Sequence, residues 1–279
     1  MVSLFHQNMR RYGGGSAWKN GLFDTDFAAI QAITGAVYAV GGFTEITNNQ
    51  TGQHFATRAL SLDPGFDKWT LIELGITALG TTEYLGIAWD STEVNAQHSG
   101  QVIYDGFTRR WTCHNTAAPP GGLKVLPKQT AVDKKRKFGG DEADTRGLAY
   151  IAGTEATNGT NCIFGFMHNM NTLGNKSGAY RSLNDMAAAV VAATGYMGPT
   201  IYIGGDFNVP PNDPLDGGLL HVAGERDAAN THYLNTTSAN PFDFWLTDDA
   251  GTTNGDADIF YQTLASGASD HAGIKLIVW

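Results

Sequence analysis

The chain has 279 residues, of which 42% are hydrophobic and 16% charged, and its formal net charge is −9. This length suits one large α/β domain or two small ones, and it excludes a small module held together by disulfides. The acidic balance argues against tight, non-specific binding of polyanions, which usually needs a basic excess. The low charge content and the 35 glycines favour many tight turns, and they slightly favour a secreted or delivered protein.

The first predicted elements in chain order are a strand, a helix and a second strand. VSLFHQN (2–8) predicts the strand, and DTDFAAIQAIT (24–34) predicts the helix because its apolar residues recur at helical spacing. GAVYAVGGFTE (35–45) then returns as a buried strand that ends in an acid. Because the chain reads as a strand from its second residue, we expect no leader peptide in this sequence. No run approaches the roughly 18 apolar residues of a membrane helix.

The remainder is rich in strands and adds one clear helix, predicted at 180–194. Strands are predicted at 69–76, 84–89, 101–107, 147–152, 162–167, 199–208, 257–262 and 273–278. Few helices and many strands favour a two-sheet sandwich with outer helices over a doubly wound sheet. No fixed-period repeat or interdomain linker is visible, so we expect a single domain over residues 1–279 and a monomer.

The two cysteines, Cys113 and Cys162, have neither a CxxC nor a zinc-finger spacing. Two buried thiols are the simpler expectation for this pair. A single bridge between them is the alternative.

Polar side chains gather at the ends of the predicted strands. They are Asn8, Glu45, His168, Asp206, Asn208, Asp258, Asp270 and His271. Two carboxylates about 4 Å apart repel by roughly 4 kcal/mol at an effective dielectric constant of about 20, so converging acids imply a bound cation. Oxygen ligands from Glu, Asp and Asn suit Mg²⁺, Mn²⁺ or Ca²⁺ rather than zinc. The pattern therefore predicts a divalent-cation site.

Four short motifs resemble those of the endonuclease/exonuclease/phosphatase superfamily, of which deoxyribonuclease I is a member. They are QNMR at 7–10, TEIT with Glu45, GDFN at 205–208 and SDH at 269–271. Their order and spacing span nearly the whole chain. The resemblance implies a four-layered α-β-β-α sandwich of two packed, mainly antiparallel sheets. It also implies metal-assisted hydrolysis of a phosphate ester.

The resemblance further implies a role for each matching residue. The metal-binding positions are Asn8, Glu45 and Asp270; the pair that orients water and phosphate is Asp206 and Asn208; the general base is His271, oriented by Asp258; the second active-site histidine is His168; and the phosphate-binding residues are Arg146, Tyr84 and Asn8. One alternative stays open in the strand EYLGIAW, where Glu83 is a second candidate for a site residue, as the acid that partners His168.

The sequence predicts the substrate less specifically than it predicts the type of reaction. Segment 124–137 holds six of the eighteen Lys and Arg residues, and its run Lys134, Lys135, Arg136 and Lys137 would track a nucleic-acid backbone. A solvated surface loop is the alternative for that run. We therefore expect a Mg²⁺-dependent endonuclease acting on DNA or RNA. The other readings are a phosphomonoesterase or phospholipase C-type enzyme for an inositol phosphate or lipid headgroup, and a catalytically silent binding module.

Overall fold

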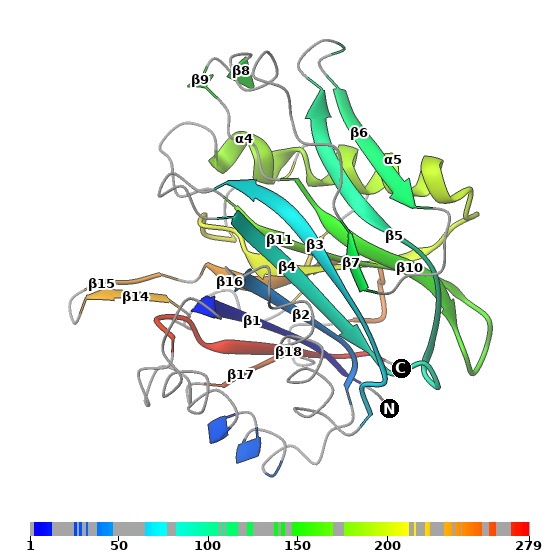
Figure 1. Ribbon diagram of the computed structural model, residues 1–279, viewed down its shortest axis with the longest axis horizontal. Coiled ribbons are helices and arrows are strands. Elements are labelled where there is room, and N and C mark those ends of the chain that lie inside the picture. Colours follow the sequence, from blue (N-terminus) through cyan, green and yellow to red (C-terminus); the bar gives the residue numbers. More distant parts are fainter. Residues whose placement is uncertain are drawn as a thin grey trace.

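The computed structural model of the chain describes most of the predicted strands (Figure 1). The described residues are 3–12, 25–26, 28–29, 32, 38–46, 65–76, 82–105, 108, 110–116, 122–124, 137–138, 141–142, 147–169, 176–211, 215, 221–223, 232–235, 238–240, 242–252, 257–260 and 269–278. No helix within these ranges is both long and apolar enough to cross a membrane.

The first large sheet, sheet A, has the strand order β17-β18-β1-β2-β4-β3-β7. The bounds are β1 Ser3–Tyr12, β2 Tyr38–Ile46, β3 Lys68–Ile76, β4 Thr82–Trp89, β7 Gly122–Lys124, β17 Ala257–Phe260 and β18 Gly273–Ile277. β1 runs parallel to β2, and β3 runs parallel to β7, whereas the other neighbours are antiparallel. The order places β1 beside β18, so segments from the two ends of the chain pair with each other.

The second large sheet, sheet B, has the order β13-β16-β12-β11-β10-β5-β6. The bounds are β5 Val94–Asp105, β6 Arg110–Thr116, β10 Ala149–Glu155, β11 Asn161–His168, β12 Thr200–Asp206, β13 His221–Ala223 and β16 Asp243–Thr247. In this sheet β11 and β12 are parallel and the other neighbours are antiparallel. Two small ladders join β8 Lys137–Phe138 to β9 Asp141–Glu142, and β14 His232–Asn235 to β15 Ser238–Asn240. The predicted sandwich of mainly antiparallel sheets is confirmed.

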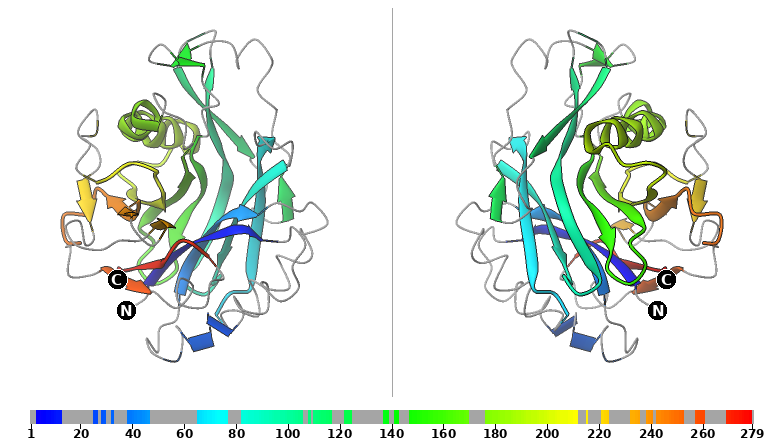
Figure 2. Two further views of the ribbon diagram at one scale, coloured as in Figure 1. Left: turned by 90° about the vertical axis from the view of Figure 1, so that its left-hand side faces the viewer. Right: turned by 90° about the vertical axis from the view of Figure 1, so that its right-hand side faces the viewer.

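Two helices, α4 Lys176–Arg181 and α5 Leu183–Thr194, lie outside sheet B (Figure 2). They replace the single helix predicted from residue 180. α5 ends at Gly195, whose left-handed φ of 72° lets its N–H bond to the Val191 carbonyl. Of the helix predicted at 24–34, residues 25, 26, 28, 29 and 32 are described, and they are helical.

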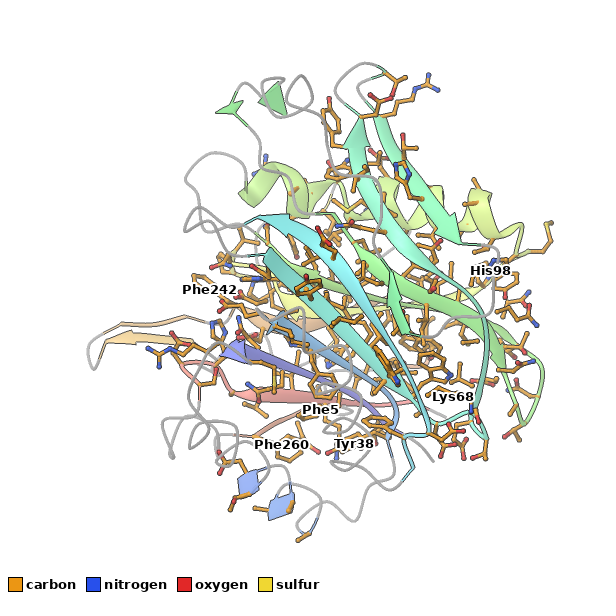
Figure 3. The ribbon with its side chains drawn as sticks, in the orientation of Figure 1. Phe5, Tyr38, Lys68, His98, Phe242 and Phe260 are labelled. Carbon is orange, nitrogen blue, oxygen red and sulfur yellow. The ribbon has the colours of Figure 1, made fainter. Side chains whose placement is uncertain are left out.

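Strand alternation sorts the buried apolar side chains into three layers. The layer between the sheets includes Leu4, Leu85, Ile87, Trp89, Phe164, Phe166, Trp245 and Ile274. The layer between sheet B and its helices includes Tyr150, Met167, Leu183, Met186, Ile203 and Phe244. The outer layer of sheet A includes Phe5, Tyr38, Phe43, Tyr84 and Phe260, of which Phe5, Tyr38 and Phe260 are labelled in Figure 3. Odd or even position in a strand therefore decides which layer a side chain enters.

The sequence pattern predicts no strand at β6 or β16, nor at the short strands β7, β8, β9, β13, β14 and β15. β16 matters most for the site, because it pairs with β12 and sets Asp243 opposite Asp206. The thiols of Cys113 and Cys162 are free, which agrees with two separate thiols and not with a bridge.

Candidate active site

Polar side chains from both sheets meet at one end of the sandwich. They are Asn8 on β1, Glu45 on β2, Glu83 on β4, His168 on β11, Asp206 on β12, Asp243 on β16 and His271 just before β18. Glu45, His168 and Asp206 lie at or next to the ends of their strands, Glu83 and Asp243 lie at or next to the starts of theirs, and Asn8 lies in the middle of β1. Figure 3 labels Phe242 at this end and Lys68 and His98 toward the opposite one.

Asp206 is the centre of the cluster. Its Oδ2 accepts a hydrogen bond from Asn8 Nδ2 at 3.2 Å and lies 3.6 Å from Nε2 of both His168 and His271. Its Oδ1 accepts the Asn208 N–H at 3.0 Å. Burial raises the pKa of Asp206 above its ordinary value, although the charge of His271 opposes part of that rise. Because burial disfavours the charged form of Asp206, a bound cation would stabilise this carboxylate.

The partner of His271 is Asp243. His271 Nδ1 lies 2.8 Å from Asp243 Oδ2, and both side chains are buried. An N–H on Nδ1 therefore donates to Asp243 and leaves Nε2 facing Asp206. Burial lowers the pKa of His271, but the carboxylates of Asp243 and Asp206 outweigh burial and raise it to about 10.

The prediction that Asp258 orients His271 is wrong, and strand alternation gives the reason. Ala257 and Ile259, on either side of Asp258, pack toward the layer between the sheets. Asp258 therefore points to the outer face of sheet A, where its Oδ2 forms an ion pair with Lys275 Nζ at 2.7 Å. Its side chain is 53% exposed, in contrast to the buried Asp243.

A second histidine–carboxylate pair faces Asp206 from the other side. His168 Nδ1 contacts Glu83 Oε1, and His168 Nε2 lies 3.4 Å from Glu45 Oε1. The structure thus favours the alternative in which Glu83 partners His168. Tyr84, the next residue on β4, points the opposite way into the outer layer of sheet A. The prediction that Tyr84 contacts the phosphate is therefore wrong.

Glu45 reaches the site because its backbone leaves the regular strand. Phe43 points to the outer layer of sheet A, and strict alternation would send Glu45 the same way. A φ of 56° at Glu45 redirects its side chain, and Asn208 has a similar φ of 52°. Such conformations cost about 1–3 kcal/mol in non-glycine residues and collect at functional sites.

Two short hydrogen-bonded links hold the site loop before β18 to β1. Ser269 Oγ donates to the Asn8 carbonyl at 2.9 Å and accepts the His271 N–H at 3.1 Å. Gln7 Nε2 donates to the His271 carbonyl at 3.2 Å. The sequence pattern predicts no role for Gln7 or Ser269, although Gln7 opens the motif QNMR and Ser269 opens the motif SDH. In these motifs Gln7 precedes Asn8 and Ser269 lies two residues before His271, and this proximity is the feature of the sequence that could have identified them as site residues.

The oxygen atoms near Asn8 fit a divalent cation. Glu45 Oε1 and Asp206 Oδ2 lie 3.3 Å and 3.2 Å from the same Asn8 nitrogen, so two carboxylates converge on one point. All-oxygen donors of this kind suit Mg²⁺, Mn²⁺ or Ca²⁺. Asp270, the third predicted metal acid, stands nearby with 26% of its side chain exposed and pairs with Arg10 at 3.4 Å.

Among the described residues, Asp206, Asp243 and His271 also bring possible ligand atoms within 4.8 Å of one another. All three residues are buried, and Asp243 and His271 already bind each other. Glu45 is 24% exposed and therefore offers a cation easier access than this trio does. We accordingly take Glu45 and Asp206 as the better pair of donors.

Several predicted residues cannot be placed in this geometry. Arg146, Lys134, Lys135 and Arg136 lie outside the described residues. Lys137 begins the short strand β8, and its side chain is outside the described part. Their assignments stay predictions.

No protein-family model and no curated protein matches the chain. Solved structures match it over nearly its full length at low identity. A mannosyl-6-phosphatase from Bacteroides thetaiotaomicron is 12% identical with a TM-score of 0.62, over 100% of each chain. The human Nocturnin catalytic domain is 10% identical with a TM-score of 0.62, over 99% of this chain and 92% of that one.

An endonuclease/exonuclease/phosphatase family protein from Leptotrichia buccalis is 10% identical with a TM-score of 0.60, again over 100% of each chain. Identities this low carry information about the fold alone. The agreement extends to both sheets, because each structure is matched over nearly its whole length. The chain therefore has the deoxyribonuclease I-like fold of the endonuclease/exonuclease/phosphatase proteins.

Proposed function

We propose that the protein is a divalent-metal-dependent phosphoester hydrolase, and that its substrate is a phosphodiester of DNA or RNA. One observation carries the proposal. A buried Asp206 lies between the His271–Asp243 pair and a second group formed by Asn8 and His168. In this proposal, His271 would act as the general base, and Asn8 and His168 would donate to the phosphate, around this one carboxylate.

His271 is the general base of this proposal. Its Nε2 lies 3.6 Å from Asp206 Oδ2, and a water that hydrogen-bonds to both atoms from one side would be polarised by both groups. Asp243 holds the ring through Nδ1, which fixes the tautomer with a lone pair on Nε2. His271 accepts a proton only in its neutral form, so sharing the Asp206 charge with a cation would remove part of what raises its pKa.

Glu45 and Asp206 would hold the cation, with Asp270 at the rim, because the Asn8 amide oxygen accepts the Arg10 N–H at 2.9 Å and the Asn8 amide nitrogen faces the two carboxylates. When bound, Mg²⁺ supplies Lewis-acid stabilisation of the charge that develops on the phosphate oxygens. The donors Asn8 Nδ2 and His168 Nε2 would contact the same oxygens from the protein side. Asn208, fixed by its hydrogen bond to the Asn169 carbonyl at 2.7 Å, holds the turn that follows Asp206.

The nuclease assignment rests on the basic run Lys134 to Lys137 and on the resemblance of the motifs. If this run tracks a phosphate backbone, replacing all four residues with Gln should raise KM for DNA. The slope of log K against log salt should change by about 0.9 for each lost contact with duplex DNA. Turnover of a small phosphodiester should stay the same, because that substrate does not extend beyond the cation site.

A phosphomonoesterase is the second candidate, and one observation favours it. The mannosyl-6-phosphatase from Bacteroides thetaiotaomicron matches the chain from end to end. A sugar phosphate or inositol phosphate would present a terminal phosphate to the same Asn8 and His168 donors. The basic run would then grip a further phosphate and leave the salt dependence of DNA cleavage, if any, unchanged.

A substrate panel separates these candidates. Purified protein in Mg²⁺ would be incubated with plasmid DNA, structured RNA, a phosphoinositide and mannose 6-phosphate, and Asp206→Asn would serve as the inactive control. We expect cleavage of a nucleic acid by the parent protein and none by the variant. Release of phosphate from the monoesters without any nucleic-acid cleavage would replace the nuclease with the second candidate. No turnover of any phosphoester would contradict the proposed function itself.

A further inference from the structure

His6, which has no part in the mechanism above, lies directly behind the His271–Asp243 pair. It is on β1, is 0% exposed and points into the layer between the sheets, as Leu4 does. Its Nδ1 is 3.9 Å from Asp243 Oδ1, while the other oxygen of that carboxylate binds His271. The Asp243 carboxylate therefore stands between two imidazole rings.

Three neighbours fix the His6 ring. Thr44 Oγ1 lies 3.4 Å from its Nε2, and Phe166 stacks on it with ring centroids 6.4 Å apart and planes inclined by 20°. Gly42 lies opposite His6 in the β1–β2 ladder. A Cβ at Gly42 would come within 2.0 Å of the Phe166 ring, so glycine is needed for that ring to reach its place. The position of His6 is thus set by two strands of one sheet and one strand of the other.

The charge of Asp243 decides which nitrogen of His6 carries the proton. The ring is fully buried between the sheets, and a neutral imidazole carries a single N–H on either Nδ1 or Nε2. A lone pair on Nδ1 would face the carboxylate and be repelled by it. With the proton on Nδ1, the N–H dipole instead points toward Asp243, and the Thr44 hydroxyl can donate to Nε2.

A separation of 3.9 Å is too long for a hydrogen bond, so the contact with Asp243 is electrostatic. Within the described residues, His6 Nδ1 has no hydrogen-bond partner that would draw it elsewhere. We propose that His6 is a positioning residue, whose N–H on Nδ1 holds the Asp243 carboxylate in the orientation that binds His271. This inference rests on the proposed function, because it assigns His6 to the base of that reaction.

Two substitutions at His6 separate positioning from packing. His6→Leu removes the donor and keeps an apolar side chain of similar size. His6→Asn keeps a donor where Nδ1 was, because the amide nitrogen of Asn and Nδ1 of His both lie one bond beyond Cγ. Thr44→Val is a third variant, which removes the hydroxyl that favours a proton on Nδ1 without changing the shape of the residue.

We expect His6→Leu to lower kcat for a small phosphodiester about tenfold, the low end of the effect of losing a group that orients an active-site ligand. KM and Mg²⁺ affinity should stay within about twofold, because neither Asn8 nor Glu45 is changed. His6→Asn should restore most of the lost kcat, and Thr44→Val should reduce kcat by less than His6→Leu does. Parent-like kcat in His6→Leu, or equal losses in the Leu and Asn variants, would overturn the inference.

A second readout needs no substrate. Proton NMR of the protein without substrate should show a low-field resonance for the His271 Nδ1–H that binds Asp243. In His6→Leu that resonance should shift or broaden, and in His6→Asn it should stay near its parent position. An unchanged resonance in His6→Leu would also overturn the inference. If the parent hydrolyses no phosphoester but the resonance responds as expected, the proposed function fails and the coupling of His6 to Asp243 stands. Should His6→Leu not fold, Thr44→Val and His6→Asn carry the same comparison.

Discussion

At the scale of single residues, two histidine–carboxylate pairs converge on Asp206. The pairs are His271 with Asp243 and His168 with Glu83. In each pair the carboxylate holds one ring nitrogen and leaves the other facing Asp206. The two pairs differ in surroundings, because His168 Nε2 also faces Glu45. In the proposed reaction, this difference assigns His168 to the cation and the phosphate, and His271 to the attacking water.

Asp243→Asn tests the assignment of the acid that orients His271. The amide would no longer accept the Nδ1 proton as a charged partner, so kcat should fall about 10²-fold or more with KM little changed. Asp258→Asn is the matched control, because Asp258 faces Lys275 on the outer side of sheet A. Steady-state kinetics on a small phosphodiester measure kcat and KM for both variants. A larger loss of kcat in Asp258→Asn than in Asp243→Asn would restore the original prediction.

Glu45→Gln tests the cation site. The variant keeps the size of the side chain but removes one of the two converging charges, so Mg²⁺ affinity should weaken on the order of 10- to 100-fold. Turnover at saturating Mg²⁺ should recover at least in part. Isothermal titration calorimetry measures the affinity, and Glu93→Gln is the control because Glu93 lies next to β5 at the opposite end of the sandwich. Equal Mg²⁺ affinity in both variants would exclude Glu45 as a ligand.

His6 also predicts how stability depends on pH. Its folded pKa is lowered below 6.5, mainly by burial, so the unfolded chain binds a proton that the folded chain does not. The folded state therefore loses stability as the pH falls below about 6.5, and it keeps this contribution above that value. His6→Asn has no imidazole at this position, so the part of the stability loss below about pH 6.5 that comes from His6 should be absent. Chemical denaturation from pH 8 to pH 5 should show a shallower decline for the variant, and parallel curves would contradict the lowered pKa.

At the scale of elements, the sequence could predict the strands that carry motifs but not all of their neighbours. The motif GDFN follows an apolar run, and that run is β12. β16 is not among the predicted strands, although its sequence DFWLT is a short aromatic-rich run typical of a buried strand. Without β16, the sequence offers Asp258 as the partner of His271, a place that Asp243 occupies in the structure.

Some features of the site could not be read from the sequence in any form. The choice between Glu83 and Tyr84 depends on which residue of β4 faces the other sheet, and the pattern of the strand alone leaves both faces apolar. The left-handed backbone of Glu45 breaks the alternation that sequence reasoning relies on. His6 reads as one more residue of an apolar strand, and only the packing of the two sheets brings Asp243 of β16 within 3.9 Å of its Nδ1.

The packing of β12 on β16 gives a prediction for the element that carries Asp206. A Cβ at Gly204 would lie 2.6 Å from the Trp245 ring, which is itself buried between the sheets. Gly204→Ala should therefore lower the free energy of unfolding by about 1–3 kcal/mol through overpacking. Thermal unfolding measures the change. Gly251→Ala is the control, since its Cβ would meet only the Asp249 carboxylate on an exposed turn, and equal losses in both variants would contradict this account of the packing.

At the scale of the whole molecule, both sheets contribute residues to the site. Sheet A supplies Asn8, Glu45 and Glu83, and sheet B supplies His168 and Asp206. His271, just before β18 of sheet A, depends on Asp243 of sheet B for its partner, so the site exists only in the packed sandwich. The net charge of −9 opposes tight binding of a polyanion and is compatible with rapid release of an anionic product.

The central claim is that a divalent cation and the Asp206–His271 pair hydrolyse a phosphoester at this single site. The most direct measurement is turnover of a small activated phosphodiester by the parent protein and by Asp206→Asn, in Mg²⁺ and in EDTA. We predict that parent activity is lost in EDTA and returns when Mg²⁺ is added back. We predict that Asp206→Asn has no activity under either condition. Its thermal unfolding transition should nevertheless be that of a folded protein. Full parent turnover in EDTA with no metal in the sample, or parent-like turnover by folded Asp206→Asn, would contradict the account.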